Sequence, residues 1–180
     1  ISAIPLVNIP FTWVAVFFHE ISHGISALLT GGSIEKIKLH LAGSGLCYTR
    51  GGIRFVILQA GYLGAVFWGV LIYMIAGKVK SKHANIIIYA ILGLIAISLI
   101  LWSRDVITWI ILLILFALFV CVLKFKTWKS GKIFLKFTGI YILLDAIKSP
   151  LYLIDGRHYG DGSKLADITH IPEFIWIVVW

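Results

Sequence analysis

Five long apolar segments, separated by short polar stretches, organise the chain. They cover residues 9–30, 53–76, 84–102, 106–123 and 133–154. A helix needs about 20 mostly apolar residues to cross the hydrocarbon core of a bilayer, so each segment is predicted to be a transmembrane helix. A sixth apolar stretch, residues 174–180, is too short to span by itself. We therefore expect an all-α membrane protein with about five to six transmembrane helices.

Residues 33–50 interrupt this pattern. Apolar and polar residues alternate with a period of two from Ile37 to Leu41, which favours a β-strand. Gly43-Ser44-Gly45 is a turn signal, and residues 46–49 could form the return strand. We expect a small membrane-associated β-hairpin after the first helix. Helices must shield it, or it must line a wet cavity, because bare backbone groups are not tolerated in lipid. The chain has no linker, so residues 1–180 are expected to form a single domain.

The composition agrees with a membrane protein and excludes a disordered chain. Hydrophobic residues make up 60% of the sequence and charged residues 13%, whereas a typical soluble domain carries about 25% charged residues. The net charge of +8 comes mostly from short basic clusters between apolar runs. This arrangement is typical of loops that meet anionic lipid, so the expected partner is the lipid bilayer and not nucleic acid.

The basic clusters also predict an orientation. The loops after the second and fourth segments are rich in lysine, which places both on the cytoplasmic face. Counting helices places the hairpin segment on the opposite face. That segment is nevertheless basic as well, which conflicts with the rule; its basic residues are Lys36, Lys38, Arg50 and Arg54.

The first apolar segment contains the sequence His19-Glu20-Ile21-Ser22-His23. Residues four apart lie on one face of a helix, so His19 and His23 can point at one metal ion. In this HExxH arrangement the two histidines bind zinc and the glutamate, here Glu20, is the general base. The alternative is that these are ordinary helix residues. Ionisable groups inside a membrane are costly unless they pair or bind something, which disfavours that alternative.

A catalytic zinc ion usually has three protein ligands and a water. The third ligand should be a histidine, aspartate or glutamate from elsewhere in the chain. The sequence offers several candidates, namely the remaining histidines together with Asp145, Asp155, Asp161, Asp167 and Glu173.

Several motifs together resemble the site-2 protease family of intramembrane zinc metalloproteases. They are HEISHG at residues 19–24, GGSIEKIKL at 31–39 and AGYLG at 60–64. The stretch GDGSKLADITHIP at residues 160–172, followed by Trp176, is similar to a compact branch of that family. The resemblance implies Asp161 as the third zinc ligand. Asp155 is second, because Asp155-Gly156 follows Pro150 at the family's usual interval although the expected asparagine is missing. Asp145 is third, and holding a histidine ring would also explain it.

The predicted function is that of an intramembrane zinc metalloprotease. Its partner would be a substrate protein whose transmembrane segment unwinds and joins the hairpin as an added strand. Two alternatives are a catalytically silent zinc-binding protein that binds partner helices and a metal or proton transporter. Glu20 argues against the first, since a structural site has no use for a base. Transporters more often contain repeats, which argues against the second. Gly61 and Gly64 are interpreted as sites of close helix packing.

Overall fold

The computed structural model describes residues 5–80, 83–124, 128–151 and 160–180. These residues form seven helices and one antiparallel pair of strands. In chain order the elements are α1 Pro5–Leu29, β1 Ser33–His40, β2 Ser44–Arg50, α2 Arg54–Lys78, α3 Ala84–Leu101, α4 Val106–Lys124, α5 Trp128–Lys148, α6 Asp161–Thr169 and α7 Glu173–Val179. The prediction of a mostly helical chain with a hairpin after the first helix is confirmed.

Three of the described helices, α2, α3 and α4, are long and apolar enough to cross a membrane. The predicted number of five to six spanning helices is therefore not reached on length and composition. Helices α1 and α5 have 25 and 21 residues and are also long enough, but α1 contains the HExxH residues and α5 contains several lysines and Asp145. Helix α5 ends at Lys148, earlier than the predicted boundary at residue 154; residues 152–154 lie outside the described part of the chain.

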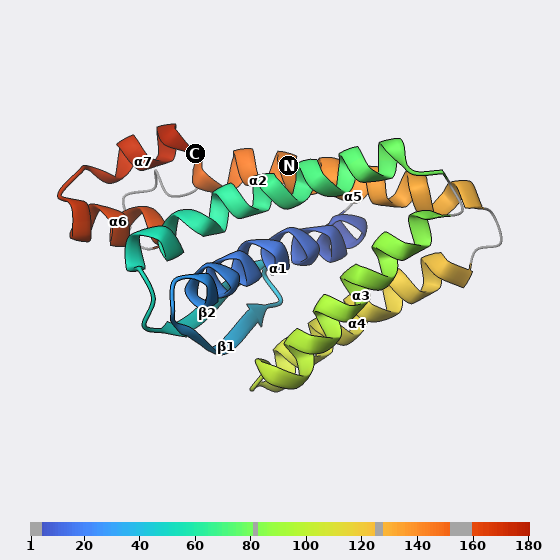
Figure 1. Cartoon of the computed structure of the whole chain (residues 1–180), viewed down its shortest axis with the longest axis horizontal. Helices are drawn as coiled ribbons and strands as arrows, with labels where there is room; N and C mark the ends of the chain where they lie inside the picture. The colour runs from blue at the N-terminus through green and yellow to red at the C-terminus, as the bar shows by residue number, and fades with distance from the viewer. Residues whose placement is uncertain (1–4, 81–82, 125–127, 152–159) are drawn as a thin grey trace.

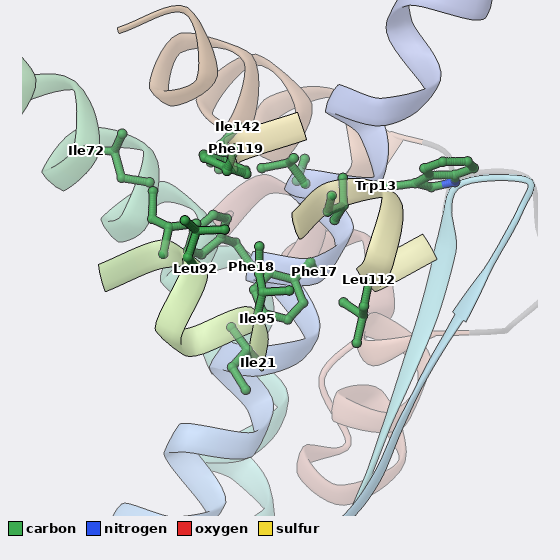
Figure 2. Close-up of a cluster of buried hydrophobic side chains, with 14 of the residues drawn as sticks. Trp13, Phe17, Phe18, Ile21, Ile72, Leu92, Ile95, Leu112, Phe119 and Ile142 are labelled. Carbon is green, nitrogen blue, oxygen red and sulfur yellow. The ribbon is translucent and has the colours of Figure 1, made fainter. Parts of the chain in front are cut away.

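Helix α1 lies in the middle of the molecule, between α2 and α5 on one side and the hairpin with α3 and α4 on the other (Figure 1). Its side chains Phe17, Phe18 and Ile21 are buried in a cluster that includes residues of α3 and α4 (Figure 2). Between lipid-immersed helices, van der Waals packing replaces the aqueous hydrophobic effect as the main stabilising term. The packing around α1 thus holds its polar face in a fixed position.

Glycines allow α2 and α5 to pack closely. A Cβ added at Gly69 would lie 3.0 Å from the carbonyl oxygen of Gly139, and one added at Gly139 would lie 2.8 Å from that of Gly69. Small residues at such a crossing let two backbones approach within a membrane. This contact brings the second half of α5 alongside α2, close to the polar face of α1.

The hairpin is bonded to the connection between α3 and α4. The Ile37 amide donates to the Trp102 carbonyl (2.9 Å), and the Leu39 amide donates to Thr108 Oγ1 (2.8 Å). The outer edge of β1 is therefore satisfied by the protein, as a strand at membrane depth requires. The contact also places the hairpin at the same end of the molecule as the α3–α4 turn. This agrees with the side predicted for the hairpin by counting helices along the sequence, opposite the lysine-rich loops.

Candidate metal centre

Helix α1 presents both histidines of the HExxH sequence on one face. The rings of His19 and His23 lie with their centroids 4.8 Å apart, and their Nε2 atoms are 3.1 Å apart. The face turns toward a region lined by α2, α5 and α6. The predicted convergence of the two imidazoles is thus present.

Asp161 completes a group of three metal-ligand side chains. It is the first residue of α6, and its Oδ2 lies 3.2 Å from His19 Nε2 and 3.1 Å from His23 Nε2. Two ligand atoms about 2.05 Å from a tetrahedral zinc ion are roughly 3.3 Å apart, so the observed spacing fits zinc. Among the described residues, this is the group of histidine, cysteine, aspartate or glutamate side chains positioned to hold a metal ion.

A hydrogen bond to the main chain of α2 fixes the orientation of the His23 ring. Its Nδ1 lies 2.6 Å from the main-chain carbonyl oxygen of Ile57 in α2. A carbonyl oxygen can only accept, so Nδ1 carries a proton and donates it, and this bond turns Nε2 toward Asp161 and His19. Metal-binding histidines are usually held by such an outer hydrogen bond.

The electrostatics of Asp161 favour its ionised form. Burial by itself would raise the pKa of this carboxyl, but the charge and hydrogen bonds of His23 and His19 outweigh burial and hold the pKa well below its ordinary value. Lys164, one turn later in α6, lies 3.9 Å from the other carboxylate oxygen. An ionised carboxylate is the form that binds a metal.

The backbone of α2 touches the two histidines. A Cβ added at Gly61 would lie 2.5 Å from His23 Nε2 and 2.6 Å from His19 Nε2. A Cβ at Gly64 would overlap Ser22. The interpretation of both glycines as close-packing positions fits this geometry, and for Gly61 the neighbours are the candidate ligands themselves.

Glu20 lies beside the three ligands in a cavity of roughly 250 Å³. Its side chain is buried, and a Cβ added at Gly45 in β2 would lie 2.8 Å from its Oε1 atom. The cavity walls come from α1, the hairpin, α2, α5 and α6, and they include Val16, Ser44, Cys47, Tyr62, Asp145, Ser149 and Lys164. The hairpin thus lines the same cavity as the HExxH residues.

An aromatic stack supports His19 from the side of α7. The His19 ring packs edge-on against Tyr62 with centroids 4.6 Å apart, and Tyr62 packs against Trp180 at 4.4 Å. The Trp180 indole donates a hydrogen bond to Gln59 Oε1 (2.7 Å). Gln59 is a buried polar residue of α2, a candidate spanning helix, and this bond gives its side chain a partner.

The other candidates for the third ligand lie elsewhere. Asp145 lines the cavity but is hydrogen-bonded to Ser149 and is not part of the metal-ligand group. Asp167 is exposed on α6, and Glu173 packs against Gly162. Asp155 lies outside the described residues. The structure therefore brings His19, His23 and Asp161 together with Glu20 beside them.

Comparison with models of protein families places the chain in one family. Residues 1–180 match the family model described as Peptidase M50B-like. The chain belongs to this family. The M50B-like assignment confirms the predicted membership of the site-2 protease family and supports a peptidase of the intramembrane metalloprotease type. Comparison of the M50B-like chain with curated proteins and with solved structures gives no match.

Some features of the M50B-like site were not predicted. Gln59 could have been noticed, because a polar side chain inside an apolar segment needs a partner. The Ile57 carbonyl carries no signal in the sequence, since any residue has one. The contact of Gly45 with Glu20 also depends on how the hairpin docks against α1.

Proposed function

We propose that this protein is a multi-pass, single-domain intramembrane zinc metalloprotease that hydrolyses peptide bonds in or near transmembrane segments of other proteins. One observation carries the proposal. The Nε2 atoms of His19 and His23 and the Oδ2 atom of Asp161 lie within 3.2 Å of one another, with Glu20 in the same cavity. In this proposal α1 and α5 also cross the bilayer, with their polar residues facing the protein interior, which gives five spanning helices.

The donor set fits zinc, since two imidazole nitrogens and one carboxylate oxygen are ligands that catalytic zinc sites use. His19, His23 and Asp161 would hold the ion. When bound, zinc supplies a Lewis acid that polarises the scissile carbonyl and acidifies water. The hydrogen bond from His23 to Ile57 and the stacking of Tyr62 on His19 fix the two rings before binding.

Glu20 is the proposed general base. Its carboxylate accepts the proton of the attacking water and then donates that proton to the nitrogen of the leaving amine. Burial excludes bulk water from this carboxylate, and the lack of a side chain at Gly45 leaves room for it. A base in this position distinguishes a hydrolytic site from a structural one.

The free edge of β2 is the proposed docking site for the unwound substrate. The amides of Ile37 and Leu39 point away from β2, toward Trp102 and Thr108. In an antiparallel pair, their opposite residues then point their own amide and carbonyl groups away from β1. These residues are Cys47 and Gly45. Within the described chain their outward groups have no hydrogen-bond partner, so an extended peptide can pair with them beside Glu20.

A cleavage assay with Glu20→Gln tests the proposal. The probe is denatured casein, incubated with the purified protein in detergent micelles containing zinc. We expect Glu20→Gln to retain zinc and to lose cleavage by about 10²–10⁴-fold, the usual contribution of a general base. The matched control is Glu35→Gln on the exposed hairpin, where Glu35 pairs with Arg50; it should cut like the wild type. Cleavage by Glu20→Gln at the wild-type rate would contradict the proposal.

A further inference from the structure

A second acidic residue lies in the cavity and has no part in the metal group. Asp145 is in the last turn of α5, and its side chain lines the cavity together with that of Ser149. Both residues share this cavity with His19, Glu20, His23 and Asp161. Asp145 is therefore placed where a bound substrate segment would lie.

Within the described residues, one of the two carboxylate oxygens of Asp145 accepts a hydrogen bond. The Ser149 hydroxyl donates to Oδ2 of Asp145 at 3.0 Å. Among the described residues no lysine or arginine forms an ion pair with Asp145. Lys148, the nearest cation along the helix, is exposed. Asp145 is thus oriented by Ser149, and no lysine or arginine of the described chain lies within ion-pair distance of it.

The other charged side chains that line the cavity are Asp161, Glu20, Lys164 and Arg54. Asp161 contacts both histidines and Lys164, and it would be a ligand of the zinc ion together with them. Glu20 lies in the same cavity as these candidate ligands. Arg54, the remaining cation of the lining, is exposed at the start of α2. A carboxylate in a membrane helix is costly unless it pairs, and it marks a functional position by default.

We propose that Asp145 is a specificity-determining residue, whose carboxylate binds a lysine or arginine side chain of the substrate close to the scissile bond. The inference rests on the proposed function. A charged partner is favoured over a substrate amide because a neutral acceptor such as asparagine would serve an amide at a lower desolvation cost. A cationic side chain compensates the full charge and is strongest in the water-poor cavity.

Mapping of cleavage sites tests the subsite. Denatured casein is digested in micelles with zinc-loaded wild type, and the ends of the products are identified by mass spectrometry. We expect lysine and arginine to be enriched at one position within a few residues of the cut. Synthetic peptides that differ only by lysine or norleucine at that position should then differ at least tenfold in kcat/KM.

Charge variants identify the residue responsible. Asp145→Asn should remove the tenfold preference, Asp145→Glu should retain it, and Asp145→Lys should favour a glutamate peptide over the lysine peptide. Asp167→Asn on the exposed face of α6 is the matched control and should keep the wild-type preference. Zinc content should be unchanged in every variant, since Asp145 is outside the ligand group.

The outcomes separate the two proposals. Absence of cutting by the zinc-loaded wild type overturns the proposed protease and the subsite with it. Cutting by the wild type without selection for basic residues overturns the subsite alone. The same holds if Asp145→Asn keeps the tenfold preference, or if it slows the lysine and norleucine peptides equally. The wild-type map does not depend on a variant, so a variant that fails to fold does not remove the test.

Discussion

Replacement of Gly61 by alanine should weaken zinc binding without unfolding the protein. The new Cβ would lie 2.5 Å from His23 Nε2 and 2.6 Å from His19 Nε2. Ordinary van der Waals contact begins at 3.4 Å, so the atoms would have to separate by about 0.8–0.9 Å. A zinc site tolerates changes of about 0.2 Å in its ligand distances. The added methyl group therefore displaces the nitrogen atoms that the ion needs.

The magnitude follows from the cost of overpacking. Extra methylene groups in a packed interior cost about 1–3 kcal/mol, and this is roughly a 5- to 150-fold change in Kd if the strain appears on binding. Competition with a chromophoric chelator in detergent measures the zinc Kd. Circular dichroism and thermal unfolding of the zinc-free protein show whether the fold is kept.

Gly77 provides a matched control, because it lies on the same helix and a Cβ added there meets nothing within 4 Å. Gly77→Ala should bind zinc like the wild type and, since alanine is the better helix former, should gain up to about 1 kcal/mol of stability. A wild-type zinc Kd in Gly61→Ala would refute the reasoning, because it would mean that α2 does not press on the two rings.

Two further predictions concern the hairpin side of the cavity. Gly45→Ala places a methyl group 2.8 Å from Glu20 Oε1; it should keep zinc but lower kcat about 100-fold, the usual effect of a misplaced catalytic group, and an unchanged kcat would contradict this contact. Burial, with the charges of Glu20 and Asp161, raises the pKa of Cys47 to about 12 from an ordinary 9.0, so little thiolate exists near pH 8. Iodoacetamide should alkylate Cys47 in folded, zinc-free Cys121→Ser protein roughly 1000-fold more slowly than in the denatured chain; similar rates would show that the thiol is not shielded.

The elements around the site could be predicted because their signals are local. A four-residue spacing puts His19 and His23 on one face of any helix, and the alternation after residue 33 with a glycine turn specifies the hairpin. Gly43 indeed adopts a positive φ of 81° in that turn. These features depend on neighbours in the chain and need no knowledge of the tertiary structure.

The meeting of α1 with α6 could not be derived from such patterns. Asp161 is 142 residues from His19, and spacing alone does not distinguish it from Asp145 or Asp155. Its choice depended on the resemblance of residues 160–172 to a known family. The Ile57 carbonyl and the close approach of Gly61 arise from how α2 packs on α1. Interactions of this kind follow from the assembled fold, and no single segment encodes them.

Zinc content measured on purified protein tests the central claim most directly. The comparison uses wild type, Asp161→Ala, Asp145→Ala and Asp155→Ala after dialysis against a weak chelator, with metal determined by mass spectrometry. We predict about one zinc per chain in the wild type, in Asp145→Ala and in Asp155→Ala, and loss of the metal in Asp161→Ala, because a site deprived of one of three protein ligands binds far more weakly. Full zinc in Asp161→Ala, with loss in either of the other variants, would contradict the proposed centre.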